Sequence, residues 1–223
     1  SYGIDRRALI QAVHQNGAML GSGMLPGPYG AWPLPEKELL ALPGYGKTAD
    51  MKAKARQLMA EAGFTPQNPL KVEIVTRNIA VYVDMASFVI NELKQIGIEA
   101  TLKQIETAQW HAMAVRGEYQ IGANLTGLGA DDPDGNFYEN YACGSPRNYT
   151  HYCNEQVQAM FDQQSQETDA KKRHTLVNAI QKKLEEDAAR PILNCRIDYF
   201  THWPHVKGLI PQNSVYNYGR MQE

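Results

Sequence analysis

Three closely spaced aspartates, Asp131, Asp132 and Asp134, lie in a Gly/Pro-rich segment and are candidates for metal ligands or for an acid/base pair. As a calcium loop the spacing fails, because with Gly135 at the invariant glycine an alanine falls at the first ligand position and a tyrosine at the bidentate one. Neighbouring carboxylates in a turn tend to diverge, and Asp-Pro-Asp-Gly is itself a turn sequence that can cap a helix near Phe137. We therefore expect a turn and a helix cap, with a catalytic carboxylate pair as the alternative.

The other reactive side chains form no catalytic constellation. Among the histidines only His202 and His205 are closely spaced, and the intervening Pro204 and the lack of a partner carboxylate argue against zinc. The chain contains no G-x-S-x-G, G-x-x-x-x-G-K-S/T or H-E-x-x-H motif, and no predicted buried strand precedes the glycines of residues 21–27. The sequence therefore predicts a protein that is not an enzyme and that holds no metal and no cofactor.

Arg77 is a candidate for ligand binding. It ends the apolar run Leu70–Thr76, which is predicted to be a strand, and a helix is expected to begin near Val81. At the carboxyl end of a strand, its planar guanidinium can hold a ligand carboxylate through two hydrogen bonds. A solvated arginine at a strand end is the alternative that the residues leave open.

The elements that must position these residues run from Leu70 to Tyr141. Apolar runs that alternate with helical patterns predict two strand–helix units and a third strand that leads into the acidic loop. The expected elements are a strand at Leu70–Arg77, a helix ending at Ile96-Gly97, a strand at Ile98–Glu106, a helix at Trp110–Val115 and a strand at Tyr119–Thr126. Because open α/β sheets bind ligands beyond the carboxyl ends of their strands, the acidic loop marks the expected binding edge.

The remaining segments are expected to add helices around this sheet. Periodicity predicts helices at Ile4–Asn16, Pro35–Leu42, Asp50–Ala62, Asn154–Gln166 and Asp169–Asp187, then a β-rich run at Pro191–Phe200 and a weaker extended tail at Val206–Tyr218. The Gly/Pro-rich segment Gly21–Gly46 carries Tyr29 and Trp32, which either wall a binding site or, as we slightly favour, pack against the helices. No repeat or linker divides residues 1–223, so we expect one α/β domain.

Composition and cysteines narrow the function classes. A net charge of −2 without a Lys/Arg run gives no sign of a nucleic-acid surface, and no apolar run approaches the roughly 18–20 residues of a membrane-spanning helix. The chain opens at Ser1 with neither an initiator methionine nor a signal segment, and we interpret it as part of a longer protein.

Cys143 and Cys153 lie ten positions apart in a polar loop without CxxC spacing, so we expect a disulfide and an oxidising compartment, with two free thiols as the alternative. Cys195 stands in an apolar run and is expected to be a buried small hydrophobe.

Several segments in a fixed order resemble one protein family. They are Ser1–Ile10, Ala53–Phe64 (AKARQLMAEAGF), Leu93–Leu102 (LKQIGIEATL), Asp131–Phe137 (DDPDGNF), Tyr152–Met160 (YCNEQVQAM) and Val206–Leu209. Together they resemble the C-terminal lobe of the family 5 extracellular solute-binding proteins, the receptors of peptide- and nickel-type ABC importers. The resemblance spans nearly the whole chain.

This resemblance implies a periplasmic or extracellular, two-lobed receptor that closes on its solute and docks on the permease subunits of an ABC transporter. The chain is then a single α/β lobe of the type II periplasmic-binding-protein-like fold, a mixed sheet flanked by helices, without its own N-terminal lobe. A loop disulfide at the positions of Cys143 and Cys153 also occurs in several members of the family.

The resemblance also implies where a ligand binds. In the dipeptide-binding branch, an arginine within one residue of Arg77 takes the peptide carboxylate, an aspartate at the position of Gly129 holds the amino group, and an aromatic near Thr107 covers the peptide. Glycine and threonine at the last two positions depart from that pattern, although Asp131 is a possible substitute for the amine clamp and Trp110 follows three residues after Thr107. The expected ligand-binding residues are Arg77, Thr107, Asn124, Thr126, Gly127, Leu128, Gly129 and Asp131, with Tyr29 and Trp32 from the long loop.

Two other functions stay open at the level of sequence. One is the ligand-sensing domain of a transcription regulator on the same fold, against which the expected disulfide and the lack of a DNA-binding segment argue. The other is a metal-dependent hydrolase that uses the aspartate loop. The identity of the solute, whether peptide, opine, sugar, nickel chelate or aromatic acid, does not follow from the sequence.

Overall fold

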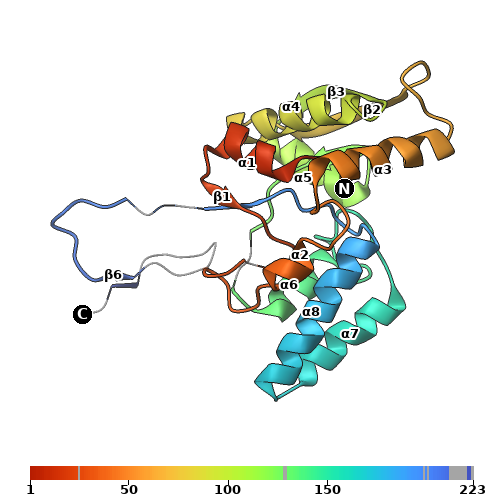
Figure 1. Ribbon diagram of the computed structural model, residues 1–223. Coiled ribbons are helices and arrows are strands. Elements are labelled where there is room, and N and C mark those ends of the chain that lie inside the picture. Colours follow the sequence, from red (N-terminus) through yellow and green to blue (C-terminus); the bar gives the residue numbers. More distant parts are fainter. Residues whose placement is uncertain (25, 128–129, 198, 200, 211–219, 222–223) are drawn as a thin grey trace.

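The computed structural model describes residues 1–24, 26–127, 130–197, 199, 201–210 and 220–221, and it consists of two packed parts (Figure 1). One part is a three-stranded sheet with helices on both faces. The other is a group of three helices from the second half of the sequence. Residues 201–210 extend away from both parts. Within the described residues, no helix is long and apolar enough to cross a membrane.

The central sheet is parallel. Its middle strand β2 (Leu70–Arg77) pairs along its whole length with β3 (Ile98–Ile105) and over three residues with β4 (Ile121–Ala123). Parallel neighbours need crossover connections, which α4 (Ala80–Lys94) and α5 (Thr107–Arg116) supply. The carboxyl ends of all three strands therefore meet at one edge of the sheet.

Helices cover both faces of β2, so Ile74, Val75 and Thr76 in its carboxyl half are buried. Ile74 packs against α4 and against Leu9 of the first helix, α1 (Arg6–His14). The next residue, Val75, faces the opposite way and packs against Trp110 of α5. Because successive side chains of a strand point to opposite faces, a continuous apolar run is what a doubly covered strand requires.

Two helices from the N-terminal third lie in different parts of the molecule. The helix α2 (Glu36–Leu39) is a single turn inside the long Gly/Pro-rich segment and lies beside the helical part, where its Glu38 forms an ion pair with Lys182 (Figure 1). The helix α3 (Thr48–Glu61) belongs to the sheet part. Its Lys52 forms an ion pair with the buried Glu92 of α4, with Nζ and Oε2 2.9 Å apart, and this pair attaches α3 to the sheet through α4.

The helical part comprises α6 (Pro133–Asn140), α7 (Glu155–Gln166) and α8 (Ala170–Glu186). Each helix begins with the N-cap that the sequence predicts, since Asp132, Asn154 and Asp169 all accept hydrogen bonds from backbone N–H groups of the first turn. The helices share a core in which Phe137 stacks on Phe161 with ring centroids 5.1 Å apart. The predicted disulfide between Cys143 and Cys153 closes the loop between α6 and α7.

Strands outside the central sheet are short. β1 (Ala18–Met19) pairs antiparallel with β5 (Cys195–Arg196), and β6 (Leu209–Ile210) pairs antiparallel with β7 (Arg220–Met221). The chain is therefore an α/β protein with strands of both directions, as expected. Within the β-rich run predicted from residue 191, only β5 is a strand among the described residues, and the predicted tail contributes β6. The predicted third strand is also longer than β4, because pairing with β2 ends at Ala123.

Three buried side chains join the two parts of the molecule. Tyr45 Oη lies 3.0 Å from Glu185 Oε1 of α8 and 3.0 Å from the carbonyl oxygen of Gly21. The Arg6 guanidinium lies 4.2 Å from the centre of the Tyr45 ring and donates to the carbonyl oxygen of Ile192 at 2.8 Å. Burial raises the pKa of Glu185 to about 7. We call these three side chains, Arg6, Tyr45 and Glu185, the joint.

Candidate functional site

Arg77 and Asn124 lie together at the carboxyl edge of the sheet. Arg77 is the last residue of β2, and Asn124 directly follows β4, so parallel pairing brings them to the same edge. Arg77 Nη2 donates to Asn124 Oδ1 at 3.0 Å and to the hydroxyl of Tyr82. Tyr82 stands in the first turn of α4, and its ring lies 4.2 Å from the guanidinium carbon. The crossover helix thus holds the arginine in place.

The charge of Arg77 is only partly compensated. Its acceptors, the Tyr82 hydroxyl and the Asn124 amide oxygen, are uncharged, and no carboxylate of the described residues forms an ion pair with it. Its Nε is buried without an acceptor in the part of the chain that the structure describes. Two exposed apolar side chains lie close to it or to its partner in sequence: Ile79, two residues after Arg77, is 42% exposed, and Leu125, the residue after Asn124, is 40% exposed. The edge therefore offers a cation beside apolar surface.

Asp131 connects the acidic loop to the long Gly/Pro-rich segment. Its Oδ2 accepts a hydrogen bond from the Ala31 backbone N–H at 2.6 Å, and its carbonyl oxygen accepts one from Trp32 Nε1 at 3.1 Å. Its Oδ1 is buried and has no partner among the described residues. One carboxylate oxygen is therefore used within the fold, and the other is the one that an amine ligand would need.

The two aromatics of the long segment have different surroundings. The ring of Trp32 stacks on His174 with centroids 5.6 Å apart, lies 4.9 Å from the Arg173 guanidinium and packs on the core of the helical part. Trp32 is thus a packing residue, the interpretation that the sequence favours slightly. Tyr29 is 48% exposed and remains on the surface of the same segment.

The other two aspartates have structural partners. Asp132 caps α6, and its carboxylate oxygens lie 3.1 and 3.2 Å from the two Nη atoms of Arg173. Asp134 accepts a hydrogen bond from Ser165 Oγ at 2.8 Å and another from Gln164. Both carboxylates hold α6 against α7 and α8, as the turn-and-cap prediction requires. No three His, Cys, Asp or Glu side chains of the described residues are grouped so that they could hold a metal.

The remaining predicted ligand residues fall at different depths. Thr107 is exposed at the first turn of α5, beside the carboxyl end of β3. Trp110 is only 2% exposed and packs edge-on against Tyr149, so it belongs to the core and is not available to cover a ligand. Gly127 is half-buried beyond Thr126. Leu128 and Gly129 lie outside the described residues.

Arg190 is a residue at this edge that the sequence did not indicate. It follows α8, and its Nη1 donates to Thr126 Oγ1 at 3.2 Å and to Asn140 Oδ1 at 3.3 Å. Its Nη2 donates to the carbonyl oxygens of Asn140 at 3.3 Å and Arg147 at 3.4 Å. The ring centre of Tyr141 lies 5.3 Å away. Thr126 is 64 positions distant, so no local pattern could reveal the contact.

A parallel sheet covered on both faces, with polar side chains gathered at its carboxyl edge, defines a ligand-binding α/β protein. The protein-family model named "Bacterial extracellular solute-binding proteins, family 5 Middle" matches residues 1–148 of this sequence. The chain belongs to this family.

Solved structures agree with the fold. OppA of Burkholderia pseudomallei matches with a TM-score of 0.75 and 22% identity, over 87% of this chain and 38% of its own. The Escherichia coli murein tripeptide binding protein MppA gives 0.76 and 20%, over 88% and 38%. NikA from Staphylococcus aureus, solved in complex with Ni(L-His)2, gives 0.69 and 22%, over 88% and 39%.

At such identities the likeness shows the fold alone, which is that of a periplasmic-binding-protein-like domain. This chain spans less than two fifths of each of these proteins. No curated protein matches it.

Proposed function

We propose that residues 1–223 form one lobe of a two-lobed receptor, the substrate-binding component of an ABC importer. The receptor captures a small solute between this lobe and its own N-terminal lobe and delivers it to permease subunits in the membrane. Family membership supports this proposal, and so does the share of about two fifths that the chain covers in similar structures. The expected location is the periplasm or the outer surface of the cell, in keeping with the disulfide.

The observation that carries the proposal is the cation at the sheet edge. Arg77 is held by uncharged partners, Tyr82 and Asn124, and no described carboxylate neutralises it. A solute carboxylate can therefore be the charge partner of this guanidinium, since hydrogen bonds between ionised groups are the strong ones. In this proposal Asn124, Thr126, Gly127 and Asp131 belong to the same wall, with Thr107 and Tyr29 at its margins.

The solute leaves this receptor unchanged in the proposed role. The lobe contributes binding groups and no proposed catalytic group, metal or cofactor. Among the similar proteins, one is named for a murein tripeptide and another was solved with a nickel–histidine complex, so small peptides and small organic chelates are both suitable classes for this chain. No observation favours a regulator's sensing domain or a hydrolase.

A thermal-shift screen of the complete receptor tests this function. A bound solute stabilises the folded state, so a true solute raises the midpoint of unfolding, and the rise grows with the logarithm of its concentration once this exceeds the dissociation constant. Mass spectrometry of the released solute should then show it unaltered. Chemical conversion of the solute by the receptor would contradict the proposal, and so would a complete absence of stabilisation across peptides, sugars, amino acids and chelates.

A further inference from the structure

Two arginines contact the short segment that follows β4. Arg77, from the end of β2, donates to Asn124 at 3.0 Å, and Arg190, from the segment after α8, donates to Thr126 at 3.2 Å. Asn124 and Thr126 are two positions apart, so their Cα atoms are separated by at most about 7 Å. Both guanidiniums therefore donate to the same three-residue segment at the proposed binding edge, although they lie more than one hundred residues apart in sequence.

Neither guanidinium has an anionic partner in the part of the chain that the structure describes. The acceptors of Arg190 are a hydroxyl, an amide oxygen and two carbonyl oxygens, and those of Arg77 are a hydroxyl and an amide oxygen. Other arginines do form ion pairs, for example Arg116 with Glu118 and Arg173 with Asp132. Uncharged acceptors fix the position of a guanidinium without cancelling its charge. Two fixed, uncompensated cations at one edge favour an anion at each.

The segment between the two contacts is open to solvent and partly apolar. Thr126 and Leu125 are both exposed, Leu125 at 40%, and the contact of Arg190 with Thr126 lies at the surface. A solute can therefore reach both arginines along this segment. Leu125, between the two contacted residues in sequence, supplies exposed apolar surface, which suits a short apolar spacer.

We propose that Arg77 and Arg190 form a two-cation site and that the solute carries two anionic groups joined by a short apolar spacer, as in a dicarboxylate or an acidic dipeptide. This inference rests on the proposed receptor function. Arg77 binds one anionic group, and Arg190 binds the second and sets the preference for a doubly charged solute. The uncharged acceptors of Arg190 hold it in position before the solute arrives.

Isosteric solutes that differ by one charge test the proposal. Calorimetry on the complete receptor would compare glutarate with glutaramate, and the dipeptide Ala-Glu with Ala-Gln, at low ionic strength. In each pair the shape is retained and one carboxylate becomes an amide. The acidic member should bind about tenfold or more tightly, because a hydrogen bond between charged groups is worth at least one factor of ten in affinity.

Substitutions assign the preference to a residue. Arg190→Gln should abolish the preference for the acidic member and leave the affinity for the amide member within about twofold. Arg190→Lys, which keeps the charge, should retain most of the preference. Arg116→Gln removes an exposed arginine that is paired with Glu118 and should change neither affinity. If Arg190→Gln does not fold, the comparison of isosteric solutes in the unaltered receptor still tests whether the solute carries two anionic groups.

Five outcomes would overturn the inference. Equal affinities within each isosteric pair would reject a doubly anionic solute, and a preference that survives Arg190→Gln would reject the role of Arg190. Equal losses for acidic and amide solutes in Arg190→Gln would show that Arg190 does not bind the second anionic group of the solute. Tight binding of an uncharged solute with no response to the acidic probes would reject this inference and leave the receptor function intact. Failure of every solute class would reject both.

Discussion

Replacing Glu185 with glutamine should remove a pH dependence from the stability of this chain. Glu185 Oε1 lies 3.0 Å from Tyr45 Oη in the joint, and the side chain is 4% exposed. The charged and titratable groups that face it are Arg6, Tyr45, the Ser1 amino group and Cys195. Burial outweighs the favourable hydrogen bond from Tyr45 and the favourable charges of Arg6 and the amino group, and it raises the pKa of Glu185 from 4.5 to about 7.

The direction of the effect follows from proton linkage. Between about pH 4.5 and pH 7 the folded chain holds a proton on Glu185 that the unfolded chain has lost. Stability is therefore greatest at the acidic end of this window and falls as the pH rises to about 7, above which the cost of a buried carboxylate is constant. A pKa that rises from 4.5 to about 7 corresponds to a loss of about 3 kcal/mol, because each tenfold change in proton affinity is worth about 1.4 kcal/mol.

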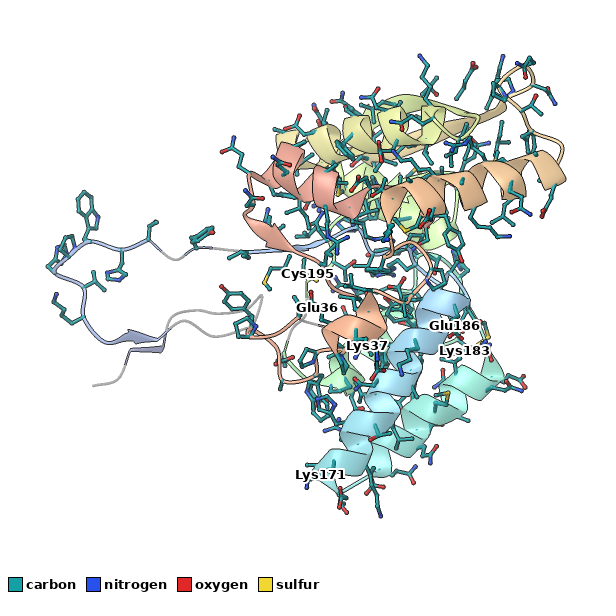
Figure 2. The ribbon with its side chains drawn as sticks, viewed as in Figure 1. Glu36, Lys37, Lys171, Lys183, Glu186 and Cys195 are labelled. Carbon is teal, nitrogen blue, oxygen red and sulfur yellow. A yellow bond between two sulfur atoms is a disulfide. The ribbon has the colours of Figure 1, made fainter. Side chains whose placement is uncertain are left out.

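Urea denaturation of this chain at a series of pH values measures the effect. The Glu185→Gln variant cannot ionise at this position. Between pH 4.5 and 7 the unfolding free energy of the unaltered chain should therefore lose about 3 kcal/mol that the variant retains. Its exposed neighbour on α8 (Figure 2) provides the control, since Glu186→Gln changes the net charge equally without altering a buried group. An unchanged pH slope in Glu185→Gln would refute the reasoning.

Four other outcomes are expected. Alkylation of the unfolded, non-reduced chain should label Cys195 alone in mass spectrometry, and three labelled thiols would refute the disulfide between the other two cysteines. Arg77→Ala in the complete receptor should weaken solute binding by about 1.5–3 kcal/mol, and unchanged calorimetric affinity would reject that role. The chain alone should bind the receptor's solute much more weakly, because half of the enclosing surface is absent, and equal affinity would contradict the two-lobe proposal. Asp132→Ala, which removes the cap of α6 and the ion pair with Arg173, should lower the unfolding free energy by about 1 kcal/mol in urea, and no change would contradict the cap.

Local signals in the sequence account for most of the helices and the two long strands. Asp132, Asn154 and Asp169 cap their helices because a side-chain oxygen placed before a helical run can satisfy backbone N–H groups within three residues. β2 is predicted over its full length, because the adjacent apolar residues Ile74 and Val75 suit a strand that is buried on both faces. These features depend only on near neighbours in the chain.

Features that depend on distant neighbours could not be predicted. The pairing of β1 with β5 joins two-residue strands from opposite ends of the chain, and neither strand is long enough to show alternation. Trp110 matches the spacing of a ligand-covering aromatic, but packing against Tyr149 decides its burial. The role of Arg190 also depends on a distant neighbour. Nothing in the sequence around this arginine indicates that it contacts Thr126, 64 positions away.

The free cysteine lies at the boundary between the two parts of the molecule (Figure 2). A Cβ atom at Gly21 would lie only 2.5 Å from Cys195 Sγ, so this glycine lets the backbone close over the sulfur. Burial raises the pKa of the Cys195 thiol to about 12, which keeps it protonated at neutral pH. A protonated thiol is a poor nucleophile, so the folded chain is protected from scrambling of its Cys143–Cys153 bridge by its own third cysteine, even where oxidants are abundant.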